Sequence, residues 1–211
     1  MKSQAYIIAV IVTFIAALVY SIVNYRKYYI DEFRKRVRVD ISLDEMHRIE
    51  ELVSATKEAF RLDDDTELDV FAQAIHVKEG KALKRINNRA QIKLPSIDGF
   101  MYVDYSSKLS HVDRRFALAH ECGHVLNHHP IPNTQQLGHG KPENEQIADY
   151  TAAAIIMPKN RVVTFLHDTH YDEMSTRQKK KLISKMCKQF DVSESSAIKR
   201  IKEVKMLISD T

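Results

Sequence analysis

The hydrophobic pattern begins with nineteen uncharged residues at positions 5–23, AYIIAVIVTFIAALVYSIV. A helix rises about 1.5 Å per residue, so a helix of this length would match a hydrocarbon core of ~30 Å. The alternative is a cleaved signal peptide, which needs a shorter apolar core and a cleavage site between small residues. Val19-Tyr20-Ser21 is a poor cleavage site. We therefore expect an uncleaved transmembrane anchor over residues 1–24.

Basic residues flank this apolar segment unequally. Only Lys2 precedes it, whereas the juxtamembrane segment over residues 25–40 contains six basic residues: Arg26, Lys27, Arg34, Lys35, Arg36 and Arg38. Basic residues beside a transmembrane helix favour the cytoplasmic side. The sequence thus predicts a single-pass protein of the cell membrane, with everything after residue 24 in the cytoplasm.

The remaining residues, 41–211, have the pattern of a domain that contains both helices and strands. Apolar positions over residues 40–60 recur near the helical period, and Ser42 followed by Glu45 has the spacing of a capping box. Three short segments resemble strands: 74–77, 90–94 and 100–105, the last of which is bounded by turn residues at 98–99 and 106–107. These strands predict a small sheet that follows the first helix of the domain.

Helices dominate the second half of the chain. The pattern predicts one helix over about residues 112–127 and another over about 143–156, which stops before Pro158. Two or three further helices follow, to about residue 208. We therefore expect an α+β fold, with a mainly helical domain, a small antiparallel sheet and one preceding transmembrane helix.

The composition is that of a globular protein, with 44% hydrophobic and 28% charged residues and a net charge of +4. Disorder is therefore not expected. The basic run Lys179-Lys180-Lys181 reads as a solvated helix face, so direct contact with nucleic acid is not expected either. Two distant cysteines, Cys122 and Cys187, form neither a disulfide framework nor a zinc-knuckle pair. Any metal ion would thus be held by His and carboxylate groups.

One predicted helix contains a metal-binding pattern. The segment HECGH begins at residue 120 and matches the pattern His-Glu-x-x-His. Because a helix turns about 100° per residue, His124 lies about 40° and Glu121 about 100° around the axis from His120. Two imidazoles one turn apart can bind a single zinc ion through bonds of about 2.0–2.1 Å. Glu121 would then lie beside the ion, where the general base of a metallopeptidase is needed.

A third ligand has to come from outside this pentad. One class of zinc peptidases uses a His six residues after the second His, but that position is Pro130 here. His128 would lie about 12 Å along the helix axis from His120, which is too far for one coordination shell. We expect His128 and His129 to support the site or to face water.

Another class of zinc sites takes its third ligand from a Glu on a separate helix. Glu145 lies on the helix predicted over residues 143–156, and Asp149 follows one turn later on the same face. Asp149 would accept a hydrogen bond from the second ring nitrogen of a ligating His and so fix its orientation. Glu143 points about 200° away from Glu145 and is the weaker candidate.

Three blocks of sequence carry a family resemblance. RFALAHECGH at residues 115–124 resembles the RFTLAHELGH block of the ImmA/IrrE family of metallopeptidases. EQIADYTAAAIIMP at residues 145–158 is similar to that family's ExxAN-x-FAAxLLMP block. FDVS at residues 190–193, followed by Arg200, is similar to its FxVSxxAxxxRL stretch. The resemblance covers about residues 40–208.

The resemblance implies a zincin-like domain with His120, His124 and Glu145 as zinc ligands and Glu121 as the catalytic base. Family members typically lack a membrane span, so the anchor is this chain's own feature. The chain departs from the family pattern at three positions: Cys122 replaces Leu or Ile, Thr151 replaces Phe, and Asp149 replaces the commoner Asn. Thr151 reduces the packing volume, so it puts the seating of the second helix in doubt.

The resemblance also implies a function. We expect a zinc endopeptidase that cuts a regulatory protein, with a helix-turn-helix repressor of a mobile element or stress response as the substrate. The alternative is a zinc-bearing regulatory module that binds a partner without proteolysis. The sequence does not single out a group that would stabilise the oxyanion, and it leaves four candidates: Tyr150, Tyr171, His167 and His170.

Overall fold

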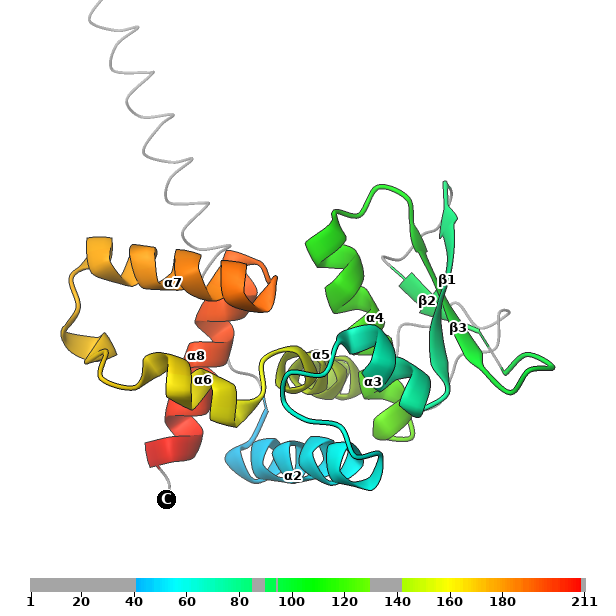
Figure 1. Ribbon diagram of the computed structural model, residues 1–211, viewed down its shortest axis with the longest axis horizontal. Coiled ribbons are helices and arrows are strands. Elements are labelled where there is room, and N and C mark those ends of the chain that lie inside the picture. Colours follow the sequence, from blue (N-terminus) through cyan, green and yellow to red (C-terminus); the bar gives the residue numbers. More distant parts are fainter. Residues whose placement is uncertain (1–40, 85–89, 94, 130–141, 210–211) are drawn as a thin grey trace, which may run out of the picture. The chain divides into compact units, whose positions relative to one another are not determined.

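The computed structural model describes residues 41–84, 90–93, 95–129 and 142–209 (Figure 1). The expected anchor and the juxtamembrane segment lie outside these residues, so both stay predictions. No helix within the described ranges is long and apolar enough to cross a bilayer. Residues from Val39 onward group into one compact unit.

The unit begins with helix α2, Leu43–Ala59, which confirms the helix expected here. The Ser42 hydroxyl accepts a hydrogen bond from the Glu45 backbone N–H, as expected for an N-cap, while the Glu45 carboxylate pairs with Arg48. The buried side of α2 is the apolar stripe of Met46, Ile49 and Val53.

The segment after α2 corrects one expectation. Residues 74–77 were expected to form a strand, but Ala74 ends a short helix, α3 (Leu68–Ala74). Strand β1 begins only at Val77 and continues to Leu83. Val77 is the only buried residue of β1, which lies at an edge of the sheet. Its polar sequence, VKEGKAL, therefore lacks the apolar alternation by which strands are identified.

The three strands form a mixed sheet in the order β1-β3-β2. Strand β2, Ala90–Ile92, runs antiparallel to β3, Met101–Ser106, as expected. Strand β1 runs parallel to β3, so the prediction of a purely antiparallel sheet is wrong. Alternation along a strand indicates which side chains are buried but not the direction of the neighbouring strand.

An irregularity in β1 is held by a buried carboxylate. The register between β1 and β3 shifts between Glu79 and Ala82. Within that shift the Lys81 backbone N–H donates to Oδ1 of Asp104, over 2.8 Å, and Lys93 forms an ion pair with the same side chain. Gly80 is required here, since a Cβ at this position would lie 2.4 Å from the Asp104 carboxylate.

Helices α4 (His111–Leu126) and α5 (Pro142–Ile156) pack against each other beside the sheet (Figure 1). Both lie where the sequence pattern places them. Their close approach depends on small residues: a Cβ at Gly123 would lie 2.8 Å from the Ala148 carbonyl oxygen. Ala148 and Ala152 are completely buried. The two predicted ligand helices are thus in direct contact.

The C-terminal part contains three α-helices and a short 3-10 turn, in agreement with the expected two or three helices. They are α6 (Lys159–Leu166), η1 (Tyr171–Glu173), α7 (Thr176–Phe190) and α8 (Glu194–Ser209). Helix α8 packs against α2, α6 and α7. Helix α5 lies next to α2 (Figure 1). Residues along one side of α7 are exposed.

Candidate metal centre

Two helices bring three potential ligands to one point. His120 and His124 lie one turn apart on α4, and Glu145 reaches them from the first turn of α5. One ligand atom from each of these residues can be chosen so that all three lie within 4.8 Å of one another. This is the only such group of His, Cys and acidic side chains in the described part of the chain.

The distances within this group suit a small dication. The Nε2 atoms of His120 and His124 are 3.0 Å apart. The Glu145 carboxylate oxygens lie 3.2 Å and 3.7 Å from the Nε2 atoms of His120 and His124. Two donors bound to zinc at tetrahedral angles lie roughly 3.3 Å apart, given bonds of about 2.0–2.1 Å. The donor set of two imidazoles and one carboxylate therefore fits a zinc ion.

Each imidazole is also held on its other nitrogen. Nδ1 of His120 donates to the Asp149 carboxylate over 2.8 Å, which is the contact expected of Asp149. Nδ1 of His124 lies 2.9 Å from Nδ1 of His129. Such partners fix the tautomer and the ring orientation of a ligating His. His129 therefore supports the site, whereas His128 is exposed with a left-handed backbone.

Charge is concentrated around His120. Burial lowers the pKa of this imidazole, but its hydrogen bonds with Asp149 and Glu145 outweigh that effect and raise the pKa to about 10. For His124, burial and the neighbouring positive charge of His120 lower the pKa to about 4. The carboxylates that hold a proton so firmly on His120 would attract a dication to the same place.

Glu121 lies beside the three candidate ligands without belonging to their group. Its carboxyl is buried, and this burial is the main reason why its pKa is raised. The charge of Glu145 raises this pKa further. The charge of His120 and a hydrogen bond from the backbone amide of Ile92 on β2 lower it in part. A buried carboxylate with a raised pKa beside potential metal ligands is suited to accept and return a proton.

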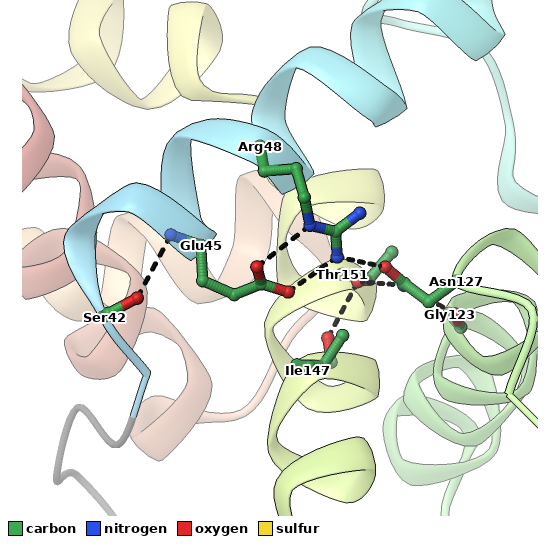
Figure 2. A network of polar contacts seen from close by, with 7 residues as sticks. All are labelled: Ser42, Glu45, Arg48, Gly123, Asn127, Ile147 and Thr151. Atoms are coloured by element: carbon green, nitrogen blue, oxygen red, sulfur yellow. Dashed lines mark hydrogen bonds and ion pairs between the residues drawn. The ribbon is translucent and has the colours of Figure 1, made fainter.

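A polar network joins α2 to the two ligand helices (Figure 2). Asn127 ends α4, and its side-chain amide donates to the Gly123 carbonyl and to the Thr151 hydroxyl, over 2.8 and 3.0 Å. The Thr151 hydroxyl in turn donates to the Ile147 carbonyl of α5. Arg48 of α2 donates to the side-chain oxygen of Asn127. Thr151 is smaller than the Phe of the family pattern. Its hydroxyl accepts a hydrogen bond from Asn127, and this bond holds α5 against α4.

The opposite side of α5 is held by a buried arginine. Arg200 on α8 is completely buried; it donates to the Met157 carbonyl over 2.9 Å and pairs with Glu50 of α2 over 2.7 Å. The Tyr150 hydroxyl donates to the same Glu50 carboxylate over 2.8 Å. The Tyr150 hydroxyl is thus engaged by Glu50, and its role as an oxyanion stabiliser stays a prediction.

Among the described residues, no contact joins the remaining candidates from the sequence to the candidate metal site. Tyr171 lies against Lys179 and Lys205, and His167 pairs with the neighbouring Asp168. Glu143 is exposed and is not part of the cluster of potential ligands. The sequence did not indicate the contributions of Asn127, Arg48 or the Ile92 amide, because each depends on tertiary contacts and not on spacing.

Comparison with known proteins agrees with this geometry. No curated protein matches the chain. The model of the Peptidase_M78 family, described as the IrrE N-terminal-like domain, matches residues 63–202. This range includes all three potential ligands, Glu121 and Asp149. The matched region covers most of the sequence, and the chain therefore belongs to the IrrE N-terminal-like family of metallopeptidases.

Proposed function

We propose that this protein is a zinc endopeptidase of the cell membrane that cuts a regulatory protein in the cytoplasm. The observation that carries the proposal is the buried carboxyl of Glu121 beside the convergent side chains of His120, His124 and Glu145. A site that only stabilised the fold would need neither a base nor an open coordination position. The family membership supports peptide-bond hydrolysis as the reaction.

In this proposal His120, His124 and Glu145 hold the ion. A zinc ion in such a site supplies positive charge that makes a water molecule more acidic and polarises the substrate carbonyl. Glu121 takes the proton from the attacking water and returns it to the leaving amine. Asp149 and His129 keep the two imidazoles in the orientation that presents their Nε2 atoms to the ion.

The finer parts of the proposal concern the substrate and the membrane. The proposed substrate is a helix-turn-helix repressor, so that cleavage would release genes from repression. Attachment to the membrane is proposed for residues 5–23, because of their length and lack of charge. Deletion of residues 1–24 is expected to move the protein from the membrane fraction to the soluble fraction, and retention in the membrane would contradict the anchor.

The catalytic proposal is tested with the purified full chain in detergent and a candidate helix-turn-helix repressor. The zinc content is measured by elemental analysis, and the repressor fragments are measured by mass spectrometry. The protein with zinc should cut the repressor at a defined bond, and the chelated protein should not. Glu121→Gln should retain stoichiometric zinc and lose cleavage. Normal cleavage by this variant would contradict the role of Glu121, and tight binding of uncut repressor would favour the regulatory alternative.

A further inference from the structure

Among the described helices, α7 carries the largest net positive charge. Its fifteen residues include no Asp or Glu but six basic residues: Arg177, Lys179, Lys180, Lys181, Lys185 and Lys188. The apolar side of the helix, Ile183, Met186 and Phe190, is buried. This helix therefore stays in place through its apolar side and presents positive charge on the other.

Five of these basic residues share one exposed side, which we call the α7 basic face: Arg177, Lys180, Lys181, Lys185 and Lys188. At about 100° per residue they occupy an arc of roughly 140° and extend about 17 Å along the axis. Ser184 is exposed in the middle of this face. The sixth, Lys179, points instead toward the ring of Tyr171 and the carbonyl of Asp172.

The charge of the α7 basic face is not neutralised by its surroundings. Among the described residues, none of the five takes part in an ion pair with an acidic group. Asp172, which lies near one end of α7, is already paired with Lys205. Five like charges on one face repel one another, so an anionic partner would relieve this repulsion.

The face is suited to a partner that is recognised by charge alone. Its exposed side chains are lysines, one arginine and one serine, with no aromatic ring that would stack on a base. Helix α8 follows α7 after a short turn, and one side of it is buried, with Ala197, Arg200, Ile201 and Val204 all covered. Its exposed side includes the apolar side chains of Met206 and Ile208, unlike the polar face with which a helix-turn-helix reads base edges.

An anionic surface is within reach if the chain is anchored as proposed. Residues 24–40 connect the apolar segment to the described unit, and seventeen residues span at most about 60 Å. The unit would thus remain close to the cytoplasmic leaflet, whose anionic lipids attract clusters of basic residues. Tethering raises the effective concentration, so even weak attraction would suffice for contact.

We propose that the α7 basic face docks on the anionic lipid headgroups of the leaflet in which the chain is anchored. This inference rests on the proposed membrane attachment and is independent of catalysis. The attraction acts over about one Debye length, ~8 Å at physiological salt, so docking is reversed by raising the ionic strength.

The test uses the full chain in lipid nanodiscs of phosphatidylcholine, alone or with phosphatidylglycerol. Lysines are acylated briefly and their modification is read by mass spectrometry. Lysines 180, 181, 185 and 188 should react several times more slowly in the anionic discs, and high salt should remove this protection. Four exposed lysines on other elements serve as internal references and should react equally in both discs: Lys81, Lys84, Lys108 and Lys202.

A second measurement leaves the lysines unmodified, so their charges stay intact. A dye is attached to the cysteine of a variant that combines Ser184→Cys with Cys187→Ser. Quenching of the dye by headgroup-labelled lipid should be strong in anionic discs. Replacement of the four α7 lysines by Gln should abolish the quenching. Replacement of the four reference lysines by Gln, which removes the same total charge, should leave it unchanged.

Three outcomes would overturn the inference. Equal acylation of the α7 lysines in both discs would show that the face does not contact lipid. Protection that appears only when duplex DNA or RNA is added would assign the face to nucleic acid. A chain that fails to incorporate into either disc would contradict the anchor itself, and this result is distinct from a chain that incorporates but remains unprotected.

Discussion

The guanidinium of Arg48 donates a hydrogen bond of 2.6 Å to the side-chain oxygen of Asn127. This contact joins residues 79 positions apart and connects α2 with the last turn of the helix that carries His120 and His124. Asn127 uses its other side-chain group to bind both α4 and α5. The geometry of the candidate metal site therefore depends on α2, a helix that supplies no ligand.

Replacement of Asn127 by Ala should loosen the two ligand helices. The variant loses two donated hydrogen bonds and one accepted bond, so we expect the free energy of unfolding to fall by about 1–2 kcal/mol. Zinc affinity should fall as well, because Thr151 no longer holds α5 against α4. Urea unfolding and zinc competition with a chromogenic chelator measure the two effects. Arg48→Ala is the control: it leaves both Asn127 donations in place and should have the smaller effect. An equal loss in both variants would contradict this order.

Replacement of Asp149 by Ala should weaken zinc binding without removing a ligand. The hydrogen bond to Nδ1 of His120 disappears, and loss of such a partner typically lowers metal affinity about 10–100-fold. Asp149→Asn retains an acceptor at the same position and should lose less. The zinc dissociation constant, measured by competition, checks both variants. Unchanged affinity in Asp149→Ala would show that the ring of His120 is oriented by other contacts.

Replacement of Gly123 by Ala should force α4 and α5 apart. The new Cβ would lie 2.8 Å from the Ala148 carbonyl oxygen, and overpacking of this kind costs about 1–3 kcal/mol. Both stability and zinc affinity should fall, since the helices carry different ligands. Gly99→Ala is a matched control, because it meets no neighbouring atom but has a backbone φ of 79°. It should lower stability by about 1 kcal/mol and leave zinc affinity unchanged.

Replacement of Asp104 by Asn should reveal a pH-dependent part of the stability. Burial opposes ionisation of Asp104, but the Lys81 amide and the Lys93 ammonium outweigh it and hold its pKa below the ordinary 3.8. A lowered pKa stabilises the fold above the pKa of the unfolded chain, and this stability is lost as the pH falls through the folded value. Asp104→Asn should therefore cost about 1 kcal/mol at pH 7.

The difference in unfolding free energy between the Asp104→Asn variant and the unmodified chain should shrink as the pH falls below about 4. Urea unfolding over a series of pH values measures this difference. A constant difference across the series would mean that the ion pair with Lys93 contributes nothing and that Asn perturbs the packing instead.

The sequence predicts those features of this protein that depend on residues close to one another in the chain. The spacing of His120 and His124 along one helix follows from the helical period, and the positions of α4 and α5 follow from caps and apolar repeats. The family resemblance and the match over residues 63–202 agree. By contrast, the direction of β1 and the existence of α3 depend on what covers these short segments, and their own residues carry little pattern.

The supporting contacts were harder to predict than the cluster itself. Asp149 could be expected to face His120 because it lies one turn after Glu145 on the same helix. Asn127 and Arg48 come from different helices, and no periodicity relates them. Tyr150 follows Asp149 directly in the sequence, but its hydroxyl binds Glu50 of α2, a contact that no sequence spacing indicates. Only the packing of α2 and α8 shows which side faces the protein interior.

The attachment of α5 on two sides has a consequence for engineering. Glu145 and Asp149 face the imidazoles, while Tyr150, about 100° around the helix from Asp149, is locked to Glu50 and the buried Arg200. The helix can neither roll nor slide without breaking one of these two sets of contacts. The selectivity of the site among metal ions would therefore have to be changed by exchanging donor atoms, because these contacts fix the position of the helix that carries Glu145.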